Sequence, residues 1–142
     1  MRQTPPSRRC LLRQGAALTA AVAVPLLALP ARAAVPAARS LAMSHTHTGE
    51  RIELVYAVAQ DYLPAALGTL NHFLRDHYSG EIGRMDPPLF DLLHALRQTL
   101  GGTGSFEIIS GYRCPATNDK LRNTRGGGVA KQSLHMQGRA VD

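Results

Sequence analysis

The last ten residues, Ser-Leu-His-Met-Gln-Gly-Arg-Ala-Val-Asp (133–142), place a histidine and an aspartate seven positions apart. His135 and Asp142 are residue types that bind zinc at about 2.0–2.2 Å, so two ligands of one ion must bring their donor atoms close together. Seven residues of helix separate the Cα atoms by roughly 10 Å, and seven residues of strand by about 23 Å. The chain is therefore expected to reverse between them, and Gly138 adopts such a tight turn most easily.

Hydrophobic spacing upstream of this string predicts a strand and two helices. Apolar residues alternate over 51–56, as in a half-buried strand, and recur at helical spacing over 62–77. A second helix is expected to begin with Asp86 as its N-cap and Pro87 at its first position. Five residues are expected to form its buried face: Leu89, Leu92, Leu93, Leu96 and Leu100.

The remaining segments indicate a small domain of mixed structure. Residues 106–109 are expected to form a short buried strand, 116–122 a short helix, and 139–142 the start of another strand. Because no strand–helix–strand repeat is present, the α+β class is favoured over a parallel α/β fold. We expect one small domain in which a short antiparallel sheet packs against helices, with the final strand or strands missing.

The first 33 residues are expected to be an export signal. A charged segment (7–13) precedes a short apolar run (15–30), and alanines near position 33 suit a cleavage site. The Ser-Arg-Arg-x-Leu-Leu pattern indicates the twin-arginine pathway, with an ordinary secretory signal or an uncleaved anchor as alternatives. Residues 34–44 are expected to be a flexible lead-in, and 45–142 the domain itself. No transmembrane anchor is expected after cleavage of the signal.

The net charge of the whole chain, +6, comes mainly from the predicted signal. Five of the 16 basic residues precede position 34, whereas all ten acidic residues follow it, so the remaining 11 basic and ten acidic residues leave a net charge of +1. Because no basic run or basic-aromatic alternation follows position 34, a nucleic-acid partner is excluded.

Only one cysteine, Cys114, follows the predicted signal, so an internal disulfide is not expected. A catalytic Cys114 paired with His135 is a distant alternative, because the Cys-Pro segment lies in a polar turn without an evident helix start.

Several separated motifs resemble those of a known peptidase group. They are His45–Glu50 (HTHTGE), Leu74–His77 (LRDH), Asp86–Leu93 (DPPLFDLL), Ser110–Arg113 (SGYR) and the terminal Ser-x-His-x-x-Gly-x-Ala-x-Asp string. Their order is similar to that in zinc peptidases of the lysostaphin, D-Ala-D-Ala carboxypeptidase and Hedgehog group, and most similar to the murein endopeptidase K family within it.

This resemblance implies Zn²⁺ as the metal and His135 and Asp142 as its ligands. It implies that Arg113 faces the substrate and steadies the carbonyl oxygen of the bond being cut, although a surface or carboxylate-paired arginine is the alternative. Ser133 and Gln137 flank the proposed ligand and could bind substrate, or could be ordinary turn residues. The family's third ligand, a histidine near a later strand, and its general base lie beyond Asp142, so the domain is expected to be incomplete.

The other histidines and charged residues are expected to be mainly structural. His45 and His47 would share one face of a strand and touch substrate or bind adventitious metal. His72, His77 and His94 are expected to be solvated or hydrogen-bonded. Arg75-Asp76 is expected to form a local pair or cap, and Asp86 to cap the second helix.

The resemblance implies an exported zinc peptidase of the periplasm or cell envelope that hydrolyses peptide cross-links between peptidoglycan peptide stems. The alternative is a non-catalytic module of the same fold that binds cell-wall peptide. Since two ligands make a weak zinc site, the 142 residues are predicted to bind zinc weakly and to cut nothing.

Overall fold

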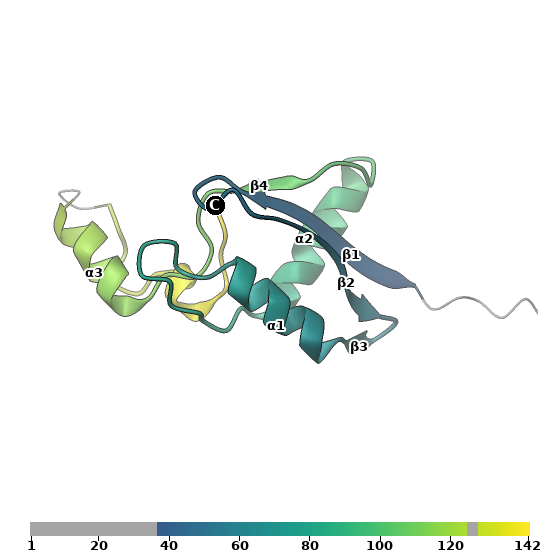
Figure 1. Cartoon of the computed structure of the whole chain (residues 1–142), viewed down its shortest axis with the longest axis horizontal. Coiled ribbons are helices and arrows are strands. Elements are labelled where there is room, and N and C mark those ends of the chain that lie inside the picture. Colours follow the sequence, from purple (N-terminus) through teal and green to yellow (C-terminus); the bar gives the residue numbers. More distant parts are fainter. Residues whose placement is uncertain (1–36, 125–127) are drawn as a thin grey trace, which may run out of the picture. The chain divides into compact units, whose positions relative to one another are not determined.

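A computed structural model describes residues 37–124 and 128–142, which belong to the compact unit Ala34–Asp142. The predicted export signal and the first residues of the predicted lead-in lie outside the described residues. The elements follow in this order: β1 (Ala38–His45), β2 (Arg51–Val58), β3 (Asp61–Tyr62), α1 (Pro64–Phe73), α2 (Pro87–Thr99), β4 (Phe106–Ile108), α3 (Pro115–Thr124) and the 3-10 turn η1 (Leu134–Gln137) (Figure 1). Within the described ranges, no helix is long and apolar enough to cross a membrane.

The strands form a four-stranded sheet in the order β3-β2-β1-β4. β1 and β3 each pair antiparallel with β2, whereas β1 and β4 run parallel. The parallel pair is possible because the long connection through α1 and α2 returns the chain to the same edge of the sheet. The α+β class is therefore confirmed, while the sheet is mixed and not antiparallel throughout.

The predicted flexible lead-in over 34–44 is wrong for residues 38–44, which form most of β1. Leu41 and Met43 alternate with small residues and are fully buried against the helices. The Ala/Ser/Arg composition concealed this alternation, and pairing with β2 along its whole length gives the segment its order.

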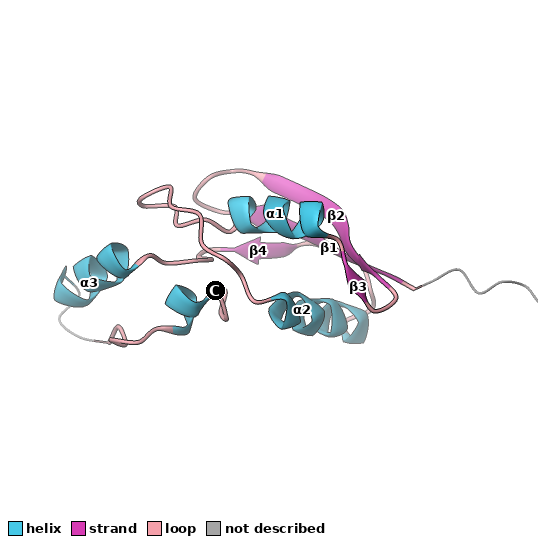
Figure 2. Ribbon diagram, turned by 90° about the horizontal axis from the view of Figure 1, so that it is seen from below, coloured by secondary structure: helices cyan, strands magenta, loops and turns pink. Residues whose placement is uncertain are grey.

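Two helices pack on the sheet, α1 against β2 and α2 against β1 (Figure 2). The core between them holds the largest buried side chains: Leu41, Met43, Tyr56, Leu70, Leu74, Met85 and Phe90. α3 and η1 lie in the part of the domain away from β3 in both views (Figures 1 and 2). The predicted strand at 51–56 and the predicted helix at 116–122 are confirmed as β2 and α3.

The buried face predicted for α2 is only partly right. Phe90 and Leu93 are the buried residues of this helix, whereas Leu92 is 65% exposed and Leu100 is 70% exposed. The helix is rotated so that its one aromatic side chain enters the core between the helices and the sheet. Asp86 and Pro87 begin the helix as predicted, but the Asp86 side chain makes no capping hydrogen bond.

Two predicted boundaries also differ from the structure. α1 ends at Phe73, four residues before the predicted end, because the chain turns there around the side chain of Asp76. Residues 139–142 form no assigned strand. Asp142 nevertheless exchanges backbone hydrogen bonds with the residues that follow β4, donating to the Ser110 oxygen at 2.9 Å and accepting from the Ile109 nitrogen at 2.7 Å.

Candidate active site

His135 is held in one orientation by two hydrogen bonds. The Ser133 hydroxyl, at the N-cap of η1, accepts the backbone N–H of His135 at 3.3 Å. The ring nitrogen Nδ1 lies 2.8 Å from the carbonyl oxygen of Gly111. Because that oxygen can only accept, Nδ1 donates a proton to it, which leaves Nε2 as the ring nitrogen that could bind a metal.

Nε2 of His135 faces the side chain of Asp142. Nε2 and Oδ2 are 3.3 Å apart. Two ligands at about 2.0–2.2 Å from a tetrahedral zinc have donor atoms separated by roughly 3.3–3.6 Å, so this pair fits two positions of one ion.

The predicted reversal at Gly138 is confirmed. Gly138 ends η1 in the left-handed conformation, with φ 65°. Its carbonyl oxygen accepts the N–H of Asp86 at 2.9 Å, and a Cβ at this position would lie 2.1 Å from the carbonyl oxygen of Arg84. The close approach of these two segments therefore requires glycine and ties the terminal string to the start of α2.

Arg113 lies beside the pair formed by His135 and Asp142. Its backbone N–H donates to the His135 carbonyl oxygen at 3.3 Å, and its Nη2 lies 4.0 Å from Oδ2 of Asp142. The preceding Tyr112 donates its N–H to the Leu74 carbonyl oxygen at 2.7 Å, which holds this loop against the end of α1. Two motifs far apart in the sequence thus meet at one site.

Asp76 fixes the two loops on either side of the site. Its carboxylate accepts the backbone N–H groups of Tyr78 and Cys114, each at 2.9 Å, and the side chain is 1% exposed. Burial alone would raise the pKa of Asp76, but hydrogen bonds from the Thr117 hydroxyl and these two N–H groups lower it to about 2. Asp76 is therefore an ionised anchor for the residues next to Arg113.

Of the local pair or cap predicted at Arg75-Asp76, the pair is wrong and the cap is confirmed, since the Asp76 side chain accepts the N–H groups of Tyr78 and Ser79. Arg75 instead makes a two-pronged ion pair with Glu50, with nitrogen–oxygen distances of 2.8 and 2.9 Å. This pair joins the end of α1 to the turn between β1 and β2, so the two charged neighbours stabilise different parts of the domain.

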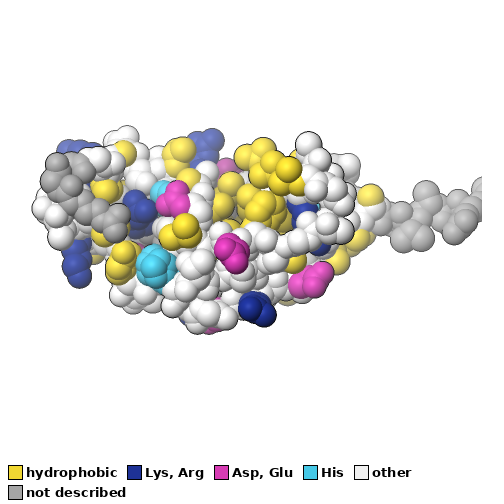
Figure 3. Space-filling model, turned by 90° about the horizontal axis from the view of Figure 1, so that it is seen from above, with side chains coloured by type: hydrophobic (Ala, Val, Ile, Leu, Met, Phe, Trp, Pro, Cys, Tyr) yellow, Lys and Arg dark blue, Asp and Glu magenta, His cyan; other side chains and the backbone are white. Residues whose placement is uncertain are grey.

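A cleft of about 150 Å³ opens at Asp142 and Arg113, and three aromatic rings from other segments line it: His47, His77 and Tyr78. The rings of His47 and His77 are stacked, with centroids 4.3 Å apart and an angle of 5°. Burial, and then the neighbouring His47, lower the pKa of His77, which favours its neutral form. Figure 3 shows histidine, basic and acidic side chains next to one another on the part of one face that lies toward α3.

Sequence reasoning placed these histidines differently. β1 ends at His45, so His47 lies in the following turn and does not share a strand face with it. His77 follows the end of α1, stacked and partly buried, and not within a helix. No periodicity relates these two positions to the terminal string, because the fold alone brings the three segments together.

Ser133 and Gln137 do not line the cleft, and neither does the buried His135. Ser133 turns its hydroxyl to the backbone of His135, and Gln137 is exposed at the end of η1. Cys114 is 2% exposed and directly precedes α3, contrary to the expectation of a turn without a helix start. Its sulfur contacts the Thr117 hydroxyl at 3.3 Å, while His135 is engaged elsewhere, so a Cys–His pair is not formed.

Over residues 37–124 and 128–142, no group of three or more His, Cys, Asp or Glu side chains is arranged to hold a metal ion. His135 and Asp142 are therefore the two donors that the described part of the chain offers at this site.

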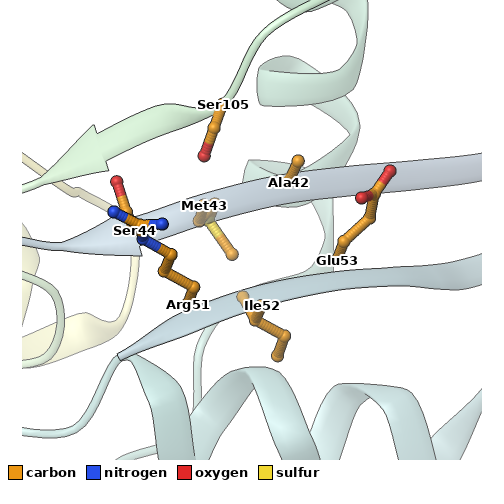
Figure 4. Close-up of a pocket in the computed structure, with 7 residues that line it drawn as sticks. All are labelled: Ala42, Met43, Ser44, Arg51, Ile52, Glu53 and Ser105. Atoms are coloured by element: carbon orange, nitrogen blue, oxygen red, sulfur yellow. The ribbon is translucent and has the colours of Figure 1, made fainter. Parts of the chain in front are cut away.

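A larger depression, about 430 Å³, lies over β1 and β2 (Figure 4). Arg51 reaches across β1 beside Ser44, and Met43 and Ile52 point to the other side of the strands (Figure 4). Arg51 and Glu53 are its only charged lining residues among those described, and it has no histidine or cysteine. Its two serines have no histidine beside them to act as a base, and its one carboxylate has no second metal donor among the lining residues, so the smaller cleft is the candidate site.

Comparison with known proteins places the chain in one family. The family described as Peptidoglycan L,D-endopeptidase MepK matches residues 33–142. The MepK proteins of Escherichia coli (strain K12) and Shigella flexneri are each 40% identical over 136 residues, which is 96% of this chain and 74% of the relative. The probable MepK of Haemophilus influenzae is 34% identical over 113 residues, or 79% of this chain and 60% of the relative. No solved structure matches the chain. From its match to the family and to these relatives, the chain belongs to the family of the peptidoglycan L,D-endopeptidase MepK.

Proposed function

We propose that this protein is an exported, zinc-dependent endopeptidase that hydrolyses L,D peptide cross-links in peptidoglycan. The observation that carries the proposal is the His135–Asp142 pair, with donor atoms 3.3 Å apart, beside Arg113 in a chain of this family. The names of the relatives supply the substrate and the cross-link type. The arrangement of His135, Asp142 and Arg113 supports the proposed zinc-dependent mechanism.

His135 through Nε2 and Asp142 through Oδ2 would hold the zinc. When bound, zinc lowers the pKa of water at its open position and polarises the scissile carbonyl. The Gly111 carbonyl oxygen keeps the proton of His135 on Nδ1 and so leaves Nε2 available as a ligand. Asp142 is a carboxylate and adds a negative charge that favours the binding of a cation.

Arg113 would stabilise the negative charge that develops on the scissile carbonyl oxygen. Its side chain is only 15% exposed, so its charge acts in a partly desolvated place. The backbone hydrogen bond to His135 and the Asp76 bond to the next residue fix its position before substrate arrives. Such a preorganised donor contributes roughly 10²–10³-fold to the rate in other hydrolases.

The proposal includes export through the twin-arginine pathway, directed by residues 1–33. The Ser-Arg-Arg-x-Leu-Leu pattern supports it, as does the substrate, which lies outside the inner membrane. The periplasm or cell envelope would then be the site of action. Replacing both Arg8 and Arg9 with Lys should retain the protein in the cytoplasm, as measured by cell fractionation.

The test of the enzymatic proposal is release of soluble muropeptides from purified peptidoglycan by the full-length protein. Added zinc should support release, and a chelator should abolish it. His135→Ala should lose both zinc binding and release, whereas Arg113→Ala should retain zinc and lose release. His72→Ala, an exposed histidine on α1, is the matched control and should behave as wild type. Cleavage that persists in the presence of chelator would overturn the zinc mechanism.

A second candidate function is a non-catalytic module that binds cell-wall peptide with the same fold. The observation that favours it is that the described residues offer two metal donors and no third. Under this alternative, the protein sediments with peptidoglycan and releases nothing at any zinc concentration. Calorimetric titration that finds one tight zinc per chain would exclude it in favour of the enzyme.

A further inference from the structure

The side chain of His45 fixes the turn that follows β1. Its Nδ1 accepts the backbone N–H of His47 at 3.2 Å. Two backbone bonds of 2.9 Å close the same turn, from the Gly49 N–H to the His45 oxygen and from the His45 N–H to the Glu50 oxygen. Because a backbone N–H can only donate, the ring nitrogen that accepts it carries no proton. His45 is therefore held as a neutral ring, with its proton on Nε2.

The surroundings of the His45 ring do not suit a charged imidazole. The residue is 2% exposed, and its ring packs edge-on against Phe73, with centroids 6.0 Å apart. Across the described ranges, its Nε2 is buried without a hydrogen-bond partner. A cationic ring would place a second N–H in the same buried environment. Since a buried charge is costly unless it is paired and hydrogen-bonded, the fold favours the neutral form.

The titratable and charged groups around His45 add to this cost. The His47 ring, on the same turn, lies 6.1 Å away between centroids, and the His77 ring, after α1, lies 5.7 Å away. Arg75 also acts on His45 as a cation, and Glu50 as an anion. Both carboxylate oxygens of Glu50 already bind Arg75, at 2.8 and 2.9 Å. A proton on His45 would therefore meet possible cations on two sides and a carboxylate that is already paired.

The same environment acts on the pKa values of the cluster. Burial, and then the neighbouring His77 and His47, lower the pKa of His45 below its ordinary value of about 6.5. Burial and then His47 lower the pKa of His77, on which Asp76 and Arg113 act in opposite directions. The cluster is therefore uncharged at neutral pH and takes up protons only in acid.

We propose that His45 is an acid-sensitive latch: a proton added to its Nδ1 removes the acceptor of the His47 N–H and releases the turn over 46–49. The proton comes from solvent and takes the lone pair that held the N–H, and no covalent bond breaks. Because His47 lines the cleft beside Arg113 and Asp142, release of the turn changes one wall of that cleft. This inference goes beyond the proposed function, since the latch needs neither zinc nor substrate.

Nitrogen NMR of the full-length protein, from about pH 8 to about pH 4.5, tests the latch across the titration range of histidine. At the upper end, the ring signals of His45 should show the proton on Nε2. On acidification, Nδ1 should take up a proton, and the amide signals of 46–49 should change with the same midpoint. Protection of the His47 amide from hydrogen exchange, relative to the intrinsic rate at each pH, should fall about tenfold, the effect of one lost hydrogen bond. Asp76 has a pKa of about 2, so the neighbouring turn keeps its anchor over this range.

Two replacements of His45 should have opposite effects. His45→Asn places an amide oxygen near the position of Nδ1 and does not titrate, so the His47 amide should stay protected at every pH. His45→Phe keeps a flat ring beside Phe73 but offers no acceptor, so protection of this amide should be low at every pH. His72→Asn makes the same replacement at an exposed histidine on α1 and should respond to acid as wild type does.

Because His45 is buried, circular dichroism at neutral pH checks the folding of both variants. If a variant does not fold, the ring signals and midpoints of wild type still decide the question. Three results would overturn the inference: a neutral His45 with its proton on Nδ1, a turn that does not change down to about pH 4.5, or an acid transition that persists in His45→Asn. The last result would assign the transition to His47 or His77. None of the three bears on the proposed function, which release of muropeptides at neutral pH tests separately.

Discussion

Replacing Gly138 with Ala should destabilise the folded domain far more than the same change at Gly49. Both glycines have positive φ, 65° and 72°, which costs a residue with a side chain roughly 1–2 kcal/mol. At Gly49 the added Cβ would meet no atom within 4 Å, so the conformational cost is the whole effect. At Gly138 it would lie 2.1 Å from the Arg84 carbonyl oxygen and 2.8 Å from the Met85 Cα.

Because both of these atoms belong to the backbone, the chain before α2 must move away from Gly138. Overpacking of this kind costs about 1–3 kcal/mol, and the movement would also break the bond between the Asp86 N–H and the Gly138 oxygen, about 1 kcal/mol. Together with the conformational cost, Gly138→Ala should lower the free energy of unfolding by about 3–6 kcal/mol, against about 1–2 kcal/mol for Gly49→Ala.

Thermal unfolding of the full-length variants, followed by circular dichroism, measures this difference. At about 4–8 °C per kcal/mol for a domain of this size, Gly49→Ala should lower Tm by roughly 4–16 °C, and Gly138→Ala by at least about 12 °C. Equal losses of Tm in the two variants would refute the close approach of Arg84 to Gly138 and, with it, the way the terminal string is held against α2.

Three further predictions concern stability, and chemical denaturation or thermal unfolding can test each. Asp76→Asn should destabilise the protein by about 2 kcal/mol at pH 7, because the amide cannot serve the backbone N–H groups as a carboxylate does. The folded pKa of Asp76 lies below its unfolded value of about 3.9, so this stabilisation is present above pH 4 and is lost as the pH falls toward 2. The difference in free energy of unfolding between wild type and Asp76→Asn should therefore shrink on acidification, and a constant difference would contradict the prediction. Leu93→Ala should lower the free energy of unfolding by about 2–5 kcal/mol, and the exposed Leu92→Ala by less than about 0.5 kcal/mol. The reverse order would mean that the buried face assigned to α2 is wrong. Tyr56→Phe should cost about 1 kcal/mol, since the buried hydroxyl donates to the side chain of Asp91 at 2.9 Å, and an unchanged unfolding midpoint would count against that bond.

Local pattern was sufficient for most of the secondary structure. The alternation over 51–56 and the Asp-Pro start at 86–87 are short-range signals, and the structure has a strand and a helix there. β1 was missed because its alternating positions are small, and pairing with β2 decides its conformation. The face of α2 was misjudged because several leucine stripes are possible on one helix, and only packing selects the one that contains Phe90.

By itself, the sequence determined the chemistry of the terminal string: two zinc-binding residue types seven positions apart, with a glycine that permits the reversal between them. These are properties of neighbouring residues and of backbone conformation, so local reasoning could reach them. The tertiary structure decided which other side chains share that site. His47, His77, Asp76 and Arg113 belong to three separate segments, and the sheet and helices that pack between those segments set their distances. The string thus predicts a metal pair, whereas the fold alone adds the wall of the cleft that faces it.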